Sequence, residues 1–359
     1  WKRRIREFLP GAKIGIIKQG RCEYDKTKDG DEPDFVIALM QSLARDDGTG
    51  TRYPKEMYRS FGLVITDEGH HLASATWSTL IPRFNAAWRL LLTATPRRKD
   101  GAEDVFFQHI SAITYRSKSQ GQPIVVRRLQ TDSTLRAIHR GDYHVDVSDL
   151  NSAQIISQLA ADEFRTRLIV DDIVGAVKAG RKIMVVSERL LHLKVMSEML
   201  ASVLFDLELP WIPNVDFYTG SWFTGEVHEK TKRGKNGNIL YRKGDLKTST
   251  RKQEELDVAE SAQIMLATKQ EAEEALDVSA IDVIVLATPM GDIEQVVGRA
   301  RRWCFPDPEK CVRLCHWRAG KCQGKPTPIV LDVVDCRVAS LRSKDRYRDR
   351  FLRQNCKTG

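Results

Sequence analysis

An apolar run that ends in two adjacent carboxylates constrains this chain more than any other feature. Leu63-Val64-Ile65-Thr66 has the length and composition of a buried parallel strand, and Asp67-Glu68-Gly69-His70 follows it directly. Open α/β sheets bind ligands at the carboxyl ends of their strands, so both acids are predicted to lie on the floor of a crevice. Adjacent acids there suit a magnesium ion and a water that attacks a phosphate. Taken alone, the same residues also fit a solvated turn.

The composition indicates a chain with room for two cores and a polyanionic partner. Its 359 residues exceed one typical domain, and 57 Lys and Arg against 48 Asp and Glu give a formal net charge of +9, which favours nucleic acid as a partner. No apolar run has the length of a membrane span. The seven cysteines do not follow the pattern of a secreted disulfide framework, and no signal segment opens the chain. We therefore expect a cytoplasmic location, or the nucleus or the cytoplasm of an infected cell, and not secretion.

The order of elements predicts an α/β fold with two lobes. Short β-rich runs separated by helical or irregular segments indicate a parallel sheet in the first lobe, at residues 12–17, 34–39, 63–66 and 88–92. The second lobe is expected to begin with one long helix from Asn151 or Ser152 to Val177, closed by Gly180. Its strands are expected at residues 182–187, 215–218, 263–267, 281–286 and, as an edge or last strand, 329–334. Residues 226–252 and 303–328 break the pattern and are interpreted as insertions or long loops.

Three motifs, in the right order, resemble those of superfamily 2 helicases. They are DEGH at residues 67–70, TAT at residues 93–95 and QxxGRxxR at residues 295–302. The chain is most similar to the DExH group, which includes XPB-type repair helicases, the phage UvsW type and type III restriction-like translocases. The resemblance implies two RecA-like parallel-sheet domains that face each other across an ATP cleft. We expect domain 1 at residues 1–128, a connector at 129–151 and domain 2 at 152–359.

The resemblance also gives roles to the acidic strand end. Asp67 is expected to hold magnesium through water, and Glu68 to polarise the attacking water. His70 is expected to link this site to the other motifs. Thr93 and Thr95 either couple the acidic site to the second lobe or simply cap the following turn.

Two neighbours of these residues have less defined roles. Gly69 stands where the family more commonly has Ala, a small change that should be tolerated. His71 is either a packed histidine or part of the site.

The arginine motif is expected to act on the same nucleotide from the second lobe. Arg299 and Arg302 are predicted to lie on one face of a helix that starts near Asp292. A guanidinium makes paired hydrogen bonds to a phosphate, so both would reach the γ-phosphate when the lobes close. Gln295 is expected to orient the nucleotide, and Gly298 belongs to the same motif.

Residues 267–277 resemble motif V of the family. Asp277 matches the residue expected near the nucleotide ribose. Ala275 stands where the family usually has Gly, and it would be strained there if the position requires a positive φ. ATP and Mg²⁺ are therefore the expected cofactors.

Nucleic-acid contacts are expected to be made to phosphates rather than to bases. By family resemblance the candidates lie at strand ends of both lobes: Gln41, Ser42, Thr219, Gly220 and Thr268. DNA is the preferred partner because the resemblance is to DNA repair and recombination motors, with RNA as the alternative. The basic stretch from Lys230 to Lys252 is either a DNA-gripping hairpin or a solvated loop.

The phosphate-binding sequence GxxxxGK[ST] does not occur in these 359 residues. We therefore expect an N-terminally truncated helicase core that turns over little ATP by itself. Three alternatives stay open: another motor of the superfamily such as a restriction-enzyme motor subunit or an RNA helicase, a non-enzymatic nucleic-acid-binding module, and an ATP-binding switch that never translocates.

A cysteine cluster in the second insertion raises the question of zinc. Thiolates at short spacing form structural zinc sites, and the candidates are Cys304, Cys311, Cys315 and Cys322. No CxxC pair is present, so free intracellular thiols are the favoured interpretation and zinc the less favoured one.

Overall fold

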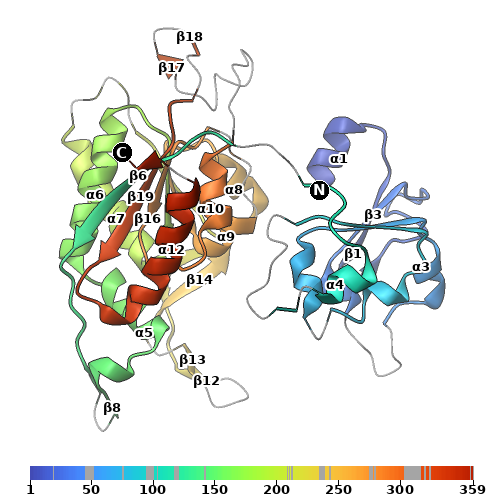
Figure 1. Cartoon of the computed structure of the whole chain (residues 1–359), viewed down its shortest axis with the longest axis horizontal. Helices are drawn as coiled ribbons and strands as arrows, with labels where there is room; N and C mark the ends of the chain where they lie inside the picture. Colours follow the sequence, from blue (N-terminus) through green and yellow to red (C-terminus); the bar gives the residue numbers. More distant parts are fainter. Residues whose placement is uncertain are drawn as a thin grey trace. The chain divides into compact units, whose positions relative to one another are not determined.

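A computed structural model describes the chain except for residues 19, 45–51, 75–76, 94–100, 103, 117–120, 141–142, 208, 210, 212, 234–238, 242–243, 275–277, 279, 303–316, 319–320, 323–324, 356 and 359. The chain forms two compact units, Trp1–Lys118 and Ser119–Gly359. Each unit has its own core, so each is described by itself (Figure 1). The predicted α/β class with parallel sheets is confirmed.

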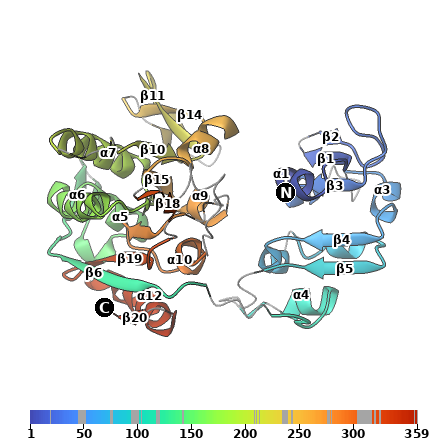
Figure 2. The ribbon, with the colours of Figure 1, turned by 90° about the horizontal axis from the view of Figure 1, so that it is seen from above.

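Unit 1 contains a three-stranded sheet in the order β2-β1-β3 and a separate parallel pair, β4-β5. Its elements are α1 (Lys2–Phe8), β1 (Ile14–Lys18), β2 (Arg21–Cys22), β3 (Phe35–Ala38), α2 (Met40–Leu43), α3 (Lys55–Arg59), β4 (Leu63–Thr66), β5 (Trp88–Leu91) and α4 (Asp104–His109), with 3-10 turns at Gly69–Ala73 and Ile81–Arg83. All four predicted strands of this lobe are present. Figure 2 shows β4 and β5 running side by side, apart from β1 and β3.

Unit 2 is built on a seven-stranded parallel sheet in the order β10-β15-β9-β16-β19-β6-β20. Its strands are β6 (Val125–Thr131), β9 (Ile183–Ser187), β10 (Val215–Tyr218), β15 (Ile264–Thr268), β16 (Val283–Leu286), β19 (Ile329–Asp335) and β20 (Lys357–Thr358). Its helices are α5 (Ser152–Ala160), α6 (Glu163–Lys178), α7 (Leu190–Phe205), α8 (Gln253–Ala259), α9 (Lys269–Glu274), α10 (Glu294–Ala300) and α12 (Arg342–Asn355).

The central strands of unit 2 are buried on both faces because successive side chains point to opposite sides of a sheet. In β9, Ile183 and Val185 pack with α6 and α7. Met184 and Val186 pack with α8, α9, α10 and α12 on the other face. Figure 2 shows the two helix layers on either side of the sheet. An unbroken apolar sequence such as Ile-Met-Val-Val is therefore what a strand in this position requires.

The smaller pairs of unit 2 are antiparallel. β7 (Ile138–Arg140) pairs with β8 (Tyr143–Val145), and β17 (Trp317–Arg318) pairs with β18 (Lys321–Cys322). The first insertion forms an antiparallel ribbon, in which β11 (Ser221–Val227) pairs with β14 (Leu246–Thr250) and β12 (Lys232–Arg233) pairs with β13 (Ile239–Tyr241). The insertion forms a hairpin, and its contact with DNA stays a prediction.

The structure corrects the predicted long helix of the second lobe, which is two helices. Asn151 caps α5 in a capping box with Gln154, as expected from the sequence. The helix α5 ends at Ala160. The Asp162 carboxylate then caps α6 by accepting a hydrogen bond of 3.0 Å from Arg165 N. Gly180 closes α6 with φ +68°.

Strand β19 is interior, not an edge or last strand as predicted. Seven residues of β19 pair with β6, from Ile329 opposite Val125 to Asp335 opposite Thr131. The polar sequence of β6 concealed this neighbour. The pairing also places β6 in unit 2, so the division after Lys118 differs from the expected boundary at residue 128. Within the described part of the chain, no helix is both long and apolar enough to cross a membrane.

Candidate functional site

The ends of β4 and β5 bring the acidic motif beside the threonine motif. The two strands are parallel and in register, with Thr66 opposite Leu91. Leu92 N donates to Thr66 O at 2.9 Å, and Gly69 N donates to Leu92 O at 2.9 Å. These backbone hydrogen bonds continue the pairing past the strands, so the residues after Thr66 and those after Leu91 lie next to each other.

The two carboxylates have different surroundings. Asp67 is exposed, and its oxygens accept hydrogen bonds from Glu68 N at 3.0 Å and from the indole N–H of Trp1 at 2.7 Å. Glu68 is half-buried, with φ 47° and ψ 46°, and is the one non-glycine residue with positive φ in the described part of the chain. This left-handed conformation turns the chain sharply after Asp67, so the adjacent acids do not follow the alternation of a strand.

His70 connects the acidic motif to the threonine motif. Its Nδ1 lies 3.4 Å from Glu68 Oε2 and 3.1 Å from Thr93 Oγ1. The His70 ring also lies against His71, with centroids 4.1 Å apart, and His71 meets the edge of Trp77 at 5.5 Å. His71 is therefore a packed ring whose residue remains exposed.

Gly69 is fixed by close packing against Leu91. A Cβ at position 69 would lie 2.1 Å from Leu91 Cγ. Gly69, which stands where the family more commonly has Ala, therefore fits against Leu91 in this chain. Gly is tolerated at position 69, as expected from the sequence, whereas an Ala side chain there would require Leu91 to shift.

Two other candidates of unit 1 lie in the short helix α2. Gln41 is exposed in α2, whereas the neighbouring Ser42 is buried. Thr95 lies outside the described residues.

The arginine motif of unit 2 is only partly helical. Gln295, Gly298 and Arg299 lie in α10, which ends at Ala300. Arg302 follows the helix, so the prediction that one helix face carries both arginines is corrected. The helix begins at Glu294, near Asp292 as predicted.

Arg299 is tied to the helix that follows β15. Its guanidinium donates to Ala272 O at 3.2 Å and to Glu273 O, both in α9. Motif VI is thereby fixed to the segment that resembles motif V. Asp277 and Ala275 lie outside the described residues.

Three nucleic-acid candidates of unit 2 lie at neighbouring strand ends. Thr268 ends β15, and Thr219 and Gly220 follow β10, its parallel neighbour. Thr219 is fully buried and its hydroxyl donates to Ser221 O at 2.8 Å. A Cβ at Gly220 would lie 2.6 Å from Glu271 Oε1. The Thr219 side chain is therefore buried, and the Glu271 carboxylate packs against Gly220.

A buried ion pair at the end of β19, another strand of the same sheet, was not predicted. Arg165 of α6 donates from Nε and Nη2 to the two oxygens of Asp335 at 2.6 and 3.2 Å, and both side chains are fully buried. Arg165 Nη1 also donates to Ala287 O at 2.7 Å, and the Thr131 hydroxyl donates to Asp335 at 2.7 Å. The run Val333-Val334-Asp335 carries the same signal as the acidic motif of unit 1, an apolar strand that ends in a carboxylate.

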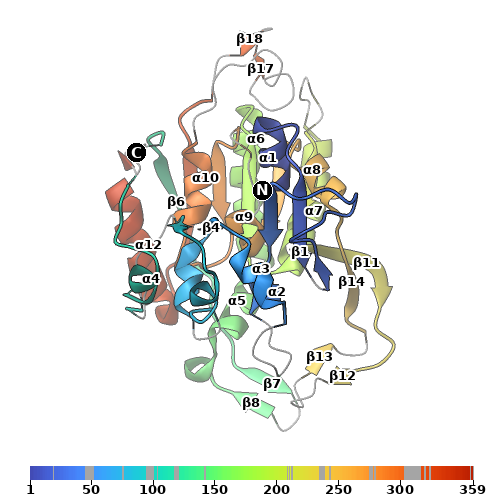
Figure 3. The ribbon, with the colours of Figure 1, turned by 90° about the vertical axis from the view of Figure 1, so that its right-hand side faces the viewer.

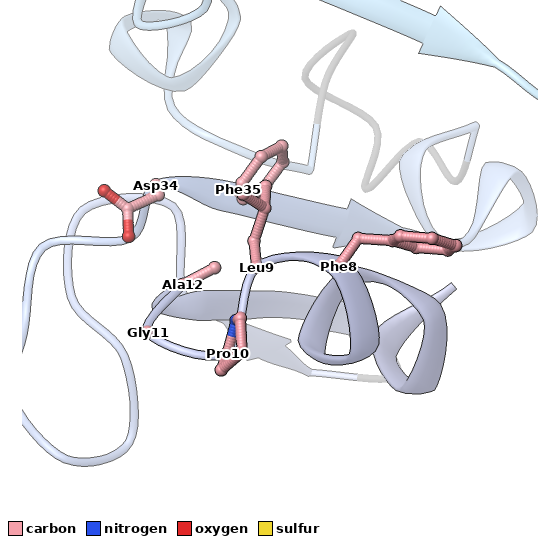
Figure 4. A pocket seen from close by; sticks show the side chains of 7 residues that line it. All are labelled: Phe8, Leu9, Pro10, Gly11, Ala12, Asp34 and Phe35. Carbon is pink, nitrogen blue, oxygen red and sulfur yellow. The ribbon is translucent and has the colours of Figure 1, made fainter.

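Two further features do not join the candidate site. Cys304, Cys311 and Cys315 lie outside the described residues, Cys322 lies in β18, and the described residues contain no cluster of three metal-ligating side chains. A hollow in unit 1 is mainly apolar (Figure 4), lined by Phe8, Leu9, Pro10, Gly11, Ala12, Asp34 and Phe35. The Asp34 carboxylate there accepts a hydrogen bond from Lys13 N.

Comparison with known proteins agrees with the motifs. Residues 1–98 match the family described as "Type III restriction enzyme, res subunit". The chain is 24% identical over 353 residues to "Putative ATP-dependent RNA helicase L396" of Acanthamoeba polyphaga mimivirus, a match that covers 98% of the chain and 56% of the relative. It is 33% identical over 116 residues to "DNA 3'-5' translocase XPB2" of Sulfurisphaera tokodaii, covering 32% of the chain and 23% of the relative. These matches are to helicases and translocases, as the motifs predicted.

The helicase fold is also found among solved structures. The DUF1998 helicase MrfA, solved with DNA and AMPPNP, is 10% identical and has a TM-score of 0.52, with 97% of this chain and 42% of that chain covered. The predicted fold class is thus confirmed, and the matches to helicases agree with the predicted resemblance to superfamily 2. The chain spans about half the length of its mimiviral relative.

Proposed function

We propose that the chain supplies most of the motor of a nucleic-acid-stimulated ATPase that moves along or remodels DNA. The observation that carries this proposal is the cluster at the ends of β4 and β5, where Glu68, His70 and Thr93 lie within contact distance. A solvated turn does not require a strained glutamate whose histidine neighbour contacts the threonine of a second motif.

In the proposed mechanism Asp67 holds Mg²⁺ through water. An exposed carboxylate fits this ion, which keeps most of its waters and takes one or two carboxylates together with substrate phosphates. The chemistry that Mg²⁺ would supply when held there is charge neutralisation at the phosphate oxygens. Glu68 accepts a proton from the attacking water. His70 holds Glu68 in place and links it to Thr93 through Nδ1.

Gln295, Arg299 and Arg302 are proposed to bind the same nucleotide, with Gly298 leaving space in the motif and Asp277 binding the ribose. A Cβ at Gly298 would meet nothing within 4 Å, so the helix is open at that point. Arg299 would pass the state of the nucleotide to α9 through its two carbonyl contacts.

The test is nucleic-acid-stimulated ATP hydrolysis by the full-length protein. Glu68→Gln should lower turnover by about a hundredfold or more, the usual effect of losing a general base. Glu56→Gln, on the exposed face of α3, is the matched control and should leave turnover unchanged. Because residues of one site act together, adding Arg299→Ala to Glu68→Gln should cost little more than either change alone. Full turnover in Glu68→Gln would contradict the site.

The isolated 359 residues should turn over little ATP, because they contain no GxxxxGK[ST] sequence. The DNA preference is supported by the translocase XPB2, and the RNA alternative by the name of the mimiviral relative. Turnover stimulated by single-stranded DNA and RNA of one sequence separates them. Stimulation by RNA alone would overturn the DNA preference and leave the ATPase proposal intact.

A further inference from the structure

The first insertion carries most of the net positive charge of the chain. Residues 226–252 contain nine Lys and Arg against three Asp and Glu, an excess of six where the whole chain has an excess of nine. These residues occupy 27 of the 359 positions. The charge is therefore concentrated on the ribbon of β11, β12, β13 and β14.

The ribbon is anchored firmly where it leaves the sheet. Trp222 of β11 stacks on Phe217 of β10 with ring centroids 3.6 Å apart. Arg251, which follows β14, donates from its backbone N to Gly220 O at 3.0 Å and from its guanidinium to Phe217 O. Arg251 also lies 3.6 Å from Asp216. Contacts at both ends of the ribbon therefore fix its direction relative to the sheet.

Beyond this base the ribbon becomes exposed. The β11 residues from Thr224 to Val227 are exposed, as are Thr248, Ser249 and Thr250 of β14. Gly225 has φ +83° and lies where the register shifts between Phe223 and Val227, which bends the ribbon. Figure 3 shows the ribbon leading away from the sheet, with β12 and β13 at its far end.

We propose that this ribbon is a nucleic-acid-binding arm that contacts the phosphate backbone. The inference rests on the proposed function and extends it, because the ribbon directly follows Thr219 and Gly220, which are nucleic-acid candidates by resemblance. Within the ribbon Lys247 lies 2.9 Å from Glu226, and at its base Arg251 lies 3.6 Å from Asp216. The excess of basic over acidic residues favours a polyanion, and the exposed hydroxyls of β14 are suitable donors to phosphate. Such contacts tolerate any sequence.

The experiment measures binding of a labelled single-stranded oligonucleotide, as DNA and as RNA of one sequence, at several salt concentrations. The test variant combines Lys230→Gln, Lys232→Gln and Arg233→Gln. We expect its Kd to rise on the order of tenfold at low salt, and the slope of log K against log salt to fall by about 2, since each phosphate contact adds roughly 0.7 for single strands.

The matched control removes three positive charges from an exposed helix of the same unit. Arg342→Gln, Arg346→Gln and Arg350→Gln lie on exposed positions of α12 and should change Kd less than twofold. An equal loss of affinity in both variants would overturn the inference, because net charge alone would then explain binding. An unchanged Kd and slope in the ribbon variant would overturn it as well.

A second measurement uses the unaltered protein and so does not depend on the folding of a variant. Bound oligonucleotide should protect Lys230 and Lys232 from acetylation, and should leave the exposed Lys178 of α6 reactive. Binding without protection of the ribbon lysines contradicts the arm and leaves the proposed function standing. The absence of any oligonucleotide binding contradicts the proposed function itself, and protection by an acidic polypeptide instead would identify a protein partner.

Discussion

The acidic strand end of unit 1 and the strand edge of unit 2 are sites of the same kind, yet the two units support them differently. In unit 1, β4 and β5 form a pair whose outward side chains are largely exposed, with Trp88 at 73% and Leu63 at 51%. In unit 2, β9, β15 and β16 are buried along almost their whole length. The same apolar pattern thus occurs in a half-covered pair and in a fully covered sheet.

The devices that fix the strand ends also differ. Unit 1 relies on a close approach between Gly69 and Leu91 and on the strained turn at Glu68. Unit 2 relies on the buried pair of Arg165 and Asp335. A change in steric fit or backbone strain should lower the free energy of unfolding by a small amount. A buried charge that loses its partner lowers it by a large amount. The strand edge of unit 2 should therefore lose more stability than that of unit 1 when one charged partner is removed.

The largest effect should follow from Arg165→Leu. Because this change leaves the Asp335 charge buried without its guanidinium, it should lower the free energy of unfolding by about 3 to 5 kcal/mol. The control is Arg127→Leu, which removes the pair with Asp172, an Arg–Asp contact between β6 and α6 in which Arg127 is 66% exposed. Exposed pairs contribute about 0 to 1 kcal/mol.

Urea unfolding measures both effects, and hydrogen exchange of the β4–β5 amides shows whether unit 1 stays intact. The double variant Arg165→Leu with Asp335→Leu should recover more than half of the loss, because it buries no unpaired charge. Equal losses in Arg165→Leu and Arg127→Leu would remove the distinction between the two edges.

The sequence was sufficient for the features that depend on local pattern. The strand before Asp67, the two-sided apolar strand before Glu188 and the capping of α5 by Asn151 each follow from neighbouring residues. The position of β19 beside β6 was not predictable in this way, because β6 reads Val-Val-Arg-Arg-Leu-Gln-Thr and gains its place only from long-range pairing.

The same limit applies within the site. The helical pattern through Arg302 gives no sign that α10 ends at Ala300, where Lys325 Nζ donates to the Ala300 and Arg302 carbonyls from a distant part of the chain. Nor does the sequence reveal the left-handed turn at Glu68 or the contact that excludes Ala at position 69. Tertiary contacts decide these features.

A smaller effect should separate glycines of the two units. Gly69→Ala places its Cβ 2.1 Å from Leu91 Cγ, so it should lower the free energy of unfolding by about 1 to 3 kcal/mol through overpacking. Gly298→Ala, in the open helix α10, should stabilise instead, by up to about 1 kcal/mol. Adding Leu91→Ala to Gly69→Ala relieves the contact, so the double variant should unfold at a temperature closer to that of the unaltered chain than to that of Gly69→Ala. The opposite order in thermal unfolding would mean that the packing lost at Leu91 outweighs the relieved contact.

A pH dependence should distinguish the buried polar network of unit 2. Burial, and then the nearby Arg165 charge, lower the pKa of His192 from about 6.5 to about 3. The unfolded state therefore takes up a proton below pH 6.5 that the folded state does not, and stability is lost as pH falls toward 3. The slope approaches about 1.4 kcal/mol per pH unit for one proton. His192→Gln keeps a partner for Ser187 and Thr166 and should flatten the curve between pH 6.5 and 5; an unchanged slope would assign it to other groups.

The smallest effect tests the strain stored at the acidic strand end. A left-handed conformation costs about 1 to 2 kcal/mol for most residues, and Asn adopts it more readily than Gln. Glu68→Asn and Glu68→Gln both remove the carboxylate, so both should lose ATP turnover in the full-length protein. Glu68→Asn should nevertheless unfold at the higher temperature, with a gain of about 1 kcal/mol over Glu68→Gln. If the two variants are equally stable, the turn at Glu68 carries no strain, and the strand end is fixed by the contact between Gly69 and Leu91 instead.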